Sequence, residues 1–542
     1  MWNIGLDNKI VKGGVRLLNN IMFQGTASNV GKSIISAGIC RVLWQDGYRV
    51  VPFKSQNMSL NSYIDKYGGE MGRAQVFQAE ACHIEPRAYM NPILLKPSGN
   101  HMSQLLMNGR LVKNISSSDY QAMKPDLVPW LEGVYNMIQK KYDIVVLEGA
   151  GSPVEININK LDISNMAMAK IADSPVVLVA DIDRGGVFAS VVGTLSLMSD
   201  EERARVKGVI INKFRGKKEY FEEGVRILED IIKIPVLGVV PYQKLGIEEE
   251  DGVSYKIYHG SRQAYRPDTI NVAVLKLDHM SNYTDFNIFE HIEGVNLSYV
   301  SLDQNLACYD WKEGWKFPDM LLIPGSKNTL GDMETLNQSP MKDQVMAYAE
   351  EGGLLIGICG GYQILGQSIK DDHALDGRGG SVKGLGLLDV YTVFGKEKKT
   401  SQVKWSFGDE EGYFSGLGGS QIEGYETHLG TSIPLDEKNR EVDKVDKIDK
   451  ELEAKHEKKE DEGQNYIIRD GHIMGTYCHG IFDSSEFLSG LLNNIAKKKG
   501  LDKKIDVKNY KSIKEAEYDK LADLIRENVD MEKIYKIIFE SK

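Results

Sequence analysis

Cys359 is the residue of this chain whose surroundings most favour chemistry. It lies in the segment Gly352–Gly366, between glycines, after a short apolar run and before Tyr362. The apolar run predicts a buried strand, and the residues after the glycines predict a helix. At such a turn, backbone N–H groups and the helix dipole stabilise a thiolate. Most free cysteines are packing residues, but glycines that permit a strained backbone favour a nucleophile here.

A nucleophilic thiol needs a base, and His479 is the candidate. It follows the apolar stretch that ends at Tyr477 and is itself followed by Gly480. The stretch predicts a strand that ends at the carboxyl edge of a sheet, where open α/β folds place their chemistry. A lone histidine is more often a surface or core residue than a catalyst. His479 is interpreted as the base because of its glycine-flanked position downstream of Cys359.

A second chemical signal is a phosphate-binding loop at Gly25–Ser33, GTASNVGKS, which follows an apolar run and precedes an apolar helical pattern. Loop N–H groups can cradle phosphate at the helix N-terminus, Lys32 adds charge, and the Ser33 hydroxyl can reach Mg²⁺. Glu148 ends another apolar strand at 143–148. Its carboxylate is suited to Mg²⁺ and thus to neutralising a transferring phosphoryl group.

The second half of the chain resembles the class I glutamine amidotransferases, and more closely the cobyric acid synthase family, on Cys359 and His479 and on the stretches 281–286, 324–329 and 424–428. The resemblance implies an oxyanion hole made by Gly325 or Ser326 together with Gly360; each donor can contribute roughly 3 kcal/mol. Many relatives carry a glutamate two residues after the histidine, where this chain has Ile481. What orients the imidazole is therefore left open.

The first half resembles the dethiobiotin synthetase-like ATPases, which use the GTxxxxGKS form of the loop. Ala27 stands where partition ATPases carry an extra lysine, which argues against that branch. The resemblance implies ATP and Mg²⁺ as cofactors, with Ser33 and Glu148 as metal ligands and Asn212 at the base. The nucleotide-binding residues we expect are Thr26, Ser28, Asn29, Gly31, Lys32, Ser33 and Asn212.

Between the loop and Glu148 lie stretches that also match the family, at 52–58, 69–75 and 90–97, and a further one follows at 149–157. They supply amides and cations suited to holding a polycarboxylate, although about half of them are expected to be caps or surface residues. The substrate-binding residues we expect are Lys54, Gln56, Asn57, Arg73 and Lys96.

Composition limits the possible partners and compartments. The net charge of −11 makes nucleic acid an unexpected partner. No apolar run approaches the roughly 20 residues of a membrane helix, and the N-terminus lacks a signal peptide's apolar core. Five scattered cysteines show no disulfide or metal spacing. We therefore expect a cytoplasmic protein.

At 542 residues the chain needs more than one core. Strands alternate with helical patterns in both halves, which predicts two doubly wound α/β domains, a P-loop ATPase sheet and a glutaminase-like sheet. We expect an extension at 1–19, an ATP-binding amide synthase domain at 20–247, a linker at 248–268, an amidotransferase domain at 269–500 with a charged insert at 434–463, and a C-terminal helical segment at 501–542.

The resemblance implies an ATP- and glutamine-dependent ligase. In the family, the b, d, e and g carboxylates of a corrinoid, adenosylcobyrinic acid a,c-diamide, become amides, giving adenosylcobyric acid in cobalamin biosynthesis. L-Glutamine and this polycarboxylate are thus the expected partners, and the oligomeric state is open. The alternatives are a cobyrinic acid a,c-diamide synthase, which amidates two other carboxylates, and a non-catalytic ATP-gated binding protein.

Overall fold

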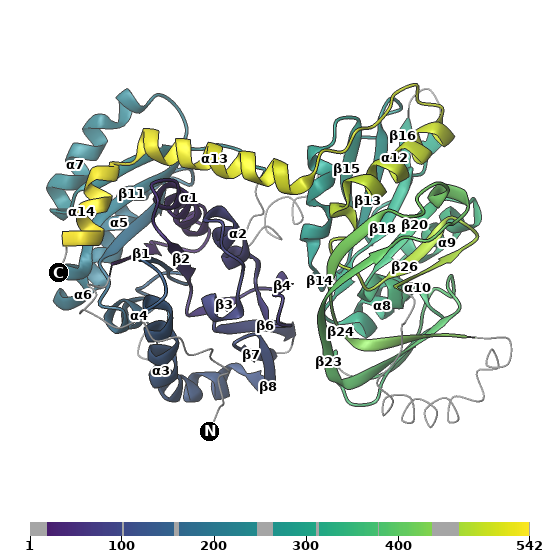
Figure 1. Ribbon diagram of the computed structural model, residues 1–542, viewed down its shortest axis with the longest axis horizontal. Helices are drawn as coiled ribbons and strands as arrows, with labels where there is room; N and C mark the ends of the chain where they lie inside the picture. Colours follow the sequence, from purple (N-terminus) through teal and green to yellow (C-terminus); the bar gives the residue numbers. More distant parts are fainter. Residues whose placement is uncertain are drawn as a thin grey trace.

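The computed structural model describes residues 19–99, 102–156, 162–246, 264–310, 314–377, 379–435 and 465–540. Two α/β domains lie side by side, and helix α13 (Tyr510–Asn528) crosses from the second domain back to the first (Figure 1). Among the described residues, no helix combines the length and the hydrophobicity that a bilayer span requires.

The first domain is built on a six-stranded sheet in the order β12-β11-β10-β1-β9-β2, with every neighbouring pair parallel. Parallel strands end at one edge of a sheet, so the phosphate loop after β1, Glu148 at the end of β9 and Asn212 in β11 share that edge. The strands are β1 (Asn20–Gly25), β2 (Val50–Phe53), β9 (Ile144–Glu148), β10 (Val176–Asp181), β11 (Val206–Phe214) and β12 (Val236–Pro241).

Helices cover both faces of this sheet. Ile21 and Phe23 of β1 belong to the core that includes α1 and α13, whereas Met22 between them belongs to the core on the other face. Successive side chains of the strand thus point to opposite faces of the sheet and pack into two different cores. The predicted doubly wound fold is confirmed. The helices of this domain are α1 (Lys32–Gln45), α2 (Arg73–Ala81), α3 (Ser117–Gln139), α4 (Met166–Ile171), α5 (Val187–Leu197), α6 (Asp200–Arg205) and α7 (Glu222–Ile232).

The region of the expected substrate motifs forms a small sheet of its own, in the order β3-β6-β7-β8, beside a hairpin of β4 and β5. Strand β4 lies against β23 and β24 of the second domain. The strands are β3 (Gln56–Met58), β4 (Ser62–Ile64), β5 (Glu70–Gly72), β6 (Ile93–Gly99), β7 (Met102–Met107) and β8 (Arg110–Ser116).

The second domain has a sheet in the order β15-β13-β18-β20-β26-β25, parallel except for the edge strand β25. Strands β20 and β26, which precede Cys359 and His479, are neighbours. The elements are β13 (Ile270–Lys276), β15 (Val295–Ser301), β18 (Met320–Ile323), β20 (Leu354–Ile358), β25 (Tyr466–Arg469), β26 (Ile473–Thr476), α8 (Thr329–Gln338), α9 (Met341–Glu350), α10 (Gly360–Leu365) and α12 (Ser485–Lys499).

Beside this sheet stands a four-stranded sheet that contains a long antiparallel hairpin. The hairpin is β23 (Val390–Ser406) with β24 (Gln421–Pro434), and β21 (Ser368–Asp371) and β22 (Gly380–Lys383) extend it. Figure 1 shows the hairpin along the side of the domain that faces the first domain. Residues 436–463 of the expected charged insert lie outside the described residues, as do residues 1–18 and most of the expected linker.

The C-terminal segment packs on the first domain. A helical pattern over residues 513–539 predicts a packed amphipathic helix, and the structure has α13 and then α14 (Met531–Glu540). The break lies at Val529, which forms an isolated bridge with Gly238 of β12, while Asp530 N donates to Leu237 O at 2.7 Å. Pairing with this strand takes the backbone out of helical geometry for two residues.

A buried charge cluster joins the two domains. Glu70 of β5 forms ion pairs with Lys96 of β6 and Lys398 of β23, and the side chains of Glu70 and Lys96 are fully buried. Burial alone would raise the pKa of Glu70, but Lys398 and Lys96 hold it well below its ordinary value. Removing one partner of such a cluster leaves buried charge uncompensated, which is strongly destabilising.

We therefore expect Glu70→Gln to lower the free energy of unfolding by about 3 kcal/mol or more. The measurement is equilibrium urea unfolding with separate probes for each domain. Glu85→Gln is the matched control, because Glu85 pairs with Lys66 on the surface, where such pairs contribute about 0–1 kcal/mol. Because the pKa of Glu70 is lowered, its contribution is complete above the ordinary glutamate range and lost as pH falls through the lowered value. Equal effects of the two substitutions would contradict this account.

Candidate active site

Cys359 occupies a sharp turn between β20 and α10, as its sequence context predicts. Its backbone has φ 53° and ψ −107°, a strained conformation for a non-glycine residue. The glycines around it are needed because the chain is crowded: a Cβ on Gly361 would lie 2.0 Å from Ile323 O, and one on Gly360 would lie 2.6 Å from Ser326 N. The turn leaves the thiol 3.7 Å from Thr427 O, on the hairpin strand β24.

His479 stands beside Cys359 because the strands before them pair, with Ile358 opposite Thr476. The imidazole is buried, and its hydrogen bond with the Cys359 thiol contributes to a raised pKa. Cys359 is largely buried, with about 8% of its surface exposed. Nucleophile and base are thus within reach of one another.

Asp285 orients the histidine, and sequence reasoning assigned it no role. Its Oδ2 lies 2.7 Å from His479 Nδ1, and its Oδ1 accepts from Gly480 N at 3.0 Å. Burial alone would lower the pKa of His479, but the charge and hydrogen bond of Asp285 raise it to about 9. A carboxylate from another part of the chain therefore stands in for the glutamate that Ile481 replaces. The sequence feature that could have pointed to Asp285 is the polar cluster at 281–286, which follows the first strand of the domain.

Asn282 contacts the other ring nitrogen and links it to the first domain. Its Nδ2 lies 3.1 Å from His479 Nε2, and its Oδ1 accepts from Ser62 N of β4 at 3.2 Å. Asn282 has φ 52°, in the left-handed region that asparagine tolerates better than most residues. Both nitrogens of His479 are thus held by residues within one short stretch of chain.

The residues of the expected oxyanion hole lie beside the turn that carries Cys359. Gly325 and Ser326 form β19, which pairs with β14 (Met280–Ser281), and Ser326 N approaches the Cα of Gly360. Ser326 Oγ donates to Asp332 at 2.5 Å, which fixes this loop. The backbones of Ser326 and Gly360 are thus in close contact beside the turn that carries Cys359.

The phosphate loop has the expected form. Gly31 adopts φ 91° before helix α1, and a Cβ there would lie 2.2 Å from the side chain of Asn212. Asn212 Nδ2 donates to Val30 O at 2.9 Å, so Asn212 braces the loop from the neighbouring strand β11. Thr26, Ser28 and Asn29 lie in the half-buried to exposed part of the loop.

Glu148 is the centre of a polar cluster at the start of α1. Its Oε1 accepts from Ser33 Oγ at 2.8 Å and lies 2.9 Å from Lys54 Nζ, while its Oε2 accepts from Gln78 Nε2. A hydroxyl and a carboxylate in contact beside a phosphate loop fit Mg²⁺, which takes one or two carboxylates together with phosphate and water. Within the described ranges no cluster of three His, Cys, Asp or Glu side chains offers an all-protein metal cage.

The expected substrate-binding residues fall into different places. Lys54 joins the Glu148 cluster, Gln56 accepts from Tyr120 at 2.6 Å, and Asn57 donates to Gln75 at 3.3 Å. Arg73 lies over the rings of Tyr63 and Tyr425, in an interdomain cleft of about 740 Å³ that His479 also lines. Lys96 is fully buried in the charge cluster with Glu70, which argues against direct contact with a substrate.

Fold and site together define a glutamine amidotransferase domain joined to a P-loop nucleotide-binding domain. Residues 271–487 match the CobB/CobQ-like glutamine amidotransferase domain family, and residues 19–250 match the AAA domain family. The chain is 44% identical to the cobyric acid synthase of Alkaliphilus metalliredigens over 95% of this chain and 99% of that one. It is 46% identical to the cobyric acid synthase of Clostridium botulinum strain Alaska E43 over 96% and 99%. The chain belongs to the cobyric acid synthase family.

Replacing Asp285 by Asn should lower glutaminase kcat by about 10²–10⁴-fold, because an amide cannot hold the same tautomer or stabilise the imidazolium. The substitution removes what raises the pKa of His479, so the pKa should fall from about 9. His479 would then lose its proton at a lower pH than in the wild-type chain, and the pH profile of glutamate release should shift accordingly. The neighbouring Thr284→Ser serves as control. An unchanged rate and profile would show that Asp285 does not orient the base.

Proposed function

We propose that this chain uses L-glutamine and ATP to amidate the b, d, e and g carboxylates of adenosylcobyrinic acid a,c-diamide, giving adenosylcobyric acid. The arrangement that supports this most is Cys359, His479 and Asp285 in one domain with a phosphate loop and the Ser33–Glu148 pair in the other. The names of the relatives favour this substrate over cobyrinic acid, the substrate of the a,c-diamide synthase alternative.

The glutaminase half would act by covalent catalysis. His479 takes the thiol proton of Cys359, and the sulfur attacks the side-chain carbonyl of glutamine. Ser326 and Gly360 N–H groups stabilise the oxyanion, and His479 then returns the proton to the departing ammonia. Water, deprotonated by His479, hydrolyses the thioester and releases glutamate. Asp285 keeps the imidazole aligned throughout these proton transfers.

The synthetase half would activate the acceptor. Loop N–H groups and Lys32 hold the ATP phosphates, and Asn212 lies toward the base. Mg²⁺ held by Ser33 and Glu148 would neutralise charge on the transferring phosphoryl group. The substrate carboxylate becomes an acyl phosphate, and ammonia displaces the phosphate to form the amide. Lys54, Gln56, Asn57 and Arg73 are the substrate-binding residues we retain, and Lys96 is assigned to the domain interface.

Two substitutions should separate the half-reactions. Cys359→Ala should abolish amidation with glutamine but leave amidation with ammonium salts within about twofold, because only the nitrogen supply is lost.

Lys32→Ala should lower amidation with either nitrogen source by at least about 10²-fold, because the phosphoryl group loses its cation. Amide formation is measured with each nitrogen source. Loss of both activities in Cys359→Ala would contradict the division of labour.

The substrate assignment is tested by mass spectrometry of the product. Incubation of the enzyme with the diamide, ATP and glutamine should convert four carboxylates to amides. Cobyrinic acid is the matched comparison substrate. Amidation of cobyrinic acid at two positions, with no reaction of the diamide, would identify the alternative synthase instead.

A further inference from the structure

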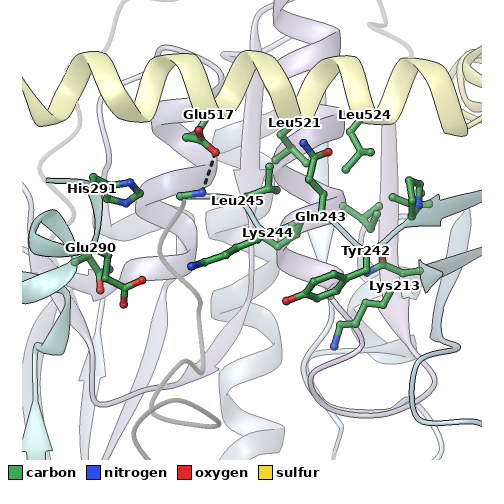
Figure 2. Close-up of a pocket in the computed structure, with 18 of the residues that line it drawn as sticks. Lys213, Tyr242, Gln243, Lys244, Leu245, Glu290, His291, Glu517, Leu521 and Leu524 are labelled. Atoms are coloured by element: carbon green, nitrogen blue, oxygen red, sulfur yellow. Dashed lines mark hydrogen bonds between the residues drawn. The ribbon is translucent and has the colours of Figure 1, made fainter. Parts of the chain in front are cut away.

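A cavity of about 420 Å³ opens beside the phosphate loop, on the side of Gly31 and Asn212. Figure 2 shows Lys213 and Tyr242 toward one end, Glu290 and His291 toward the other, and α13 above them. Its walls therefore come from three parts of the chain: the first domain, the amidotransferase domain and the C-terminal helix. The volume is within the roughly 300–1,000 Å³ of small-molecule pockets.

Sheet order decides which part of ATP faces this cavity. Glu148 at the end of β9 and Lys54 just after β2 lie on one side of β1, the side where the proposed Mg²⁺ would place the γ-phosphate. Asn212 in β11 and the end of β12 lie on the other side. A nucleotide whose phosphates lie on the loop must extend its ribose and base away from the γ-phosphate, and thus into this cavity.

The amidotransferase wall of the cavity is formed by the 3₁₀ helix η5 (Tyr283–His291) together with Tyr299 of β15. Tyr283, Asn287, Glu290 and His291 line the cavity. Asp285 of the same helix and Asn282, its N-cap, hold the two ring nitrogens of His479. A single element thus reaches the nucleotide cavity and the catalytic histidine.

The C-terminal helix closes the cavity from above. Glu517 accepts from Gly246 N at 2.8 Å, the dashed contact in Figure 2, and Leu521 and Leu524 add apolar surface. The Glu517 contact ties α13 to the segment after β12. The walls combine apolar side chains with polar and charged ones, a mixture that suits a base and ribose, and a carboxylate such as Glu290 suits ribose hydroxyls.

We propose that η5 is part of the ATP site, binding the nucleoside through Asn287 and Glu290, and that it thereby links ATP occupancy to the alignment of His479. The proposal rests on the proposed function, since it takes ATP as the nucleotide. A nucleotide packed on η5 holds Asp285 and Asn282 in place, so ATP should favour the competent histidine. By thermodynamic linkage, if bound ATP raises the affinity for glutamine, bound glutamine must raise the affinity for ATP by the same factor.

The first test measures ATP affinity by titration calorimetry on the full chain. Asn287→Ala and Glu290→Ala should each raise the Kd for ATP by about fivefold or more. Glu293→Ala is the matched control, because Glu293 lies two residues past η5, pairs with Lys503 on the surface and does not line the cavity. Its Kd should stay within twofold. Glu290→Gln provides a second, milder variant that should show the same direction of change.

The second test measures glutamate release without corrinoid. A non-hydrolysable ATP analogue should raise kcat/KM for glutamine by about fivefold or more in the wild-type chain, a usual size for coupling. The increase should disappear in Asn287→Ala and Glu290→Ala, measured at an analogue concentration below the wild-type Kd and again at saturation. Persistence of the full increase at saturation in these variants would place the coupling elsewhere and overturn the linkage.

The two proposals fail in different ways. If Lys32→Ala weakens ATP binding and the η5 variants do not, the nucleotide site stands and the role of η5 is wrong. If none of the variants changes ATP binding, the ATPase assignment itself is wrong. If ATP binds through η5 but glutamate release does not respond to the analogue, the link to His479 is wrong.

Discussion

The contact on which the two halves depend is the Asn282 side chain between His479 and Ser62. Its amide reaches the catalytic imidazole on one side and accepts from the backbone of the first domain on the other. One amide group has a fixed distance between its oxygen and nitrogen. The position of the imidazole is therefore coupled to the docking of β4 of the first domain, in addition to the Asp285 contact within its own domain.

The docking itself is polar and buried, which makes it specific. Glu70 pairs with Lys398 across the interface, Gln402 and Thr400 donate to the backbone of the β4–β5 region, and Tyr425 donates to Ser62 O. Such groups are costly to bury unless each finds its partner. A shifted domain arrangement would leave several of them unsatisfied at once. The C-terminal helices add an apolar contact, with α13 packed along α1.

Much of the site could be predicted because its signals are local. A glycine-bounded loop between a strand and a helix predicts a phosphate-binding loop, and a cysteine among glycines at a strand end predicts a sharp strand-to-helix turn. Both predictions concern residues adjacent in sequence, where backbone geometry is determined by the glycines. Lys96 shows the limit of this reasoning, because its charge suited a polycarboxylate and burial paired it with Glu70 instead.

By itself the sequence determined the two doubly wound domains, the turn at Cys359 and the phosphate loop, because short-range periodicity and glycine placement are sufficient for each. Only the tertiary structure decided what orients His479, since Asp285 lies 194 residues away and no local pattern connects them. It also decided that η5 and α13 wall the cavity beside Gly31. Contacts of this kind arise when elements distant in sequence pack together, within the amidotransferase domain for Asp285 and across the domain interface for the cavity, so no single stretch of residues encodes them.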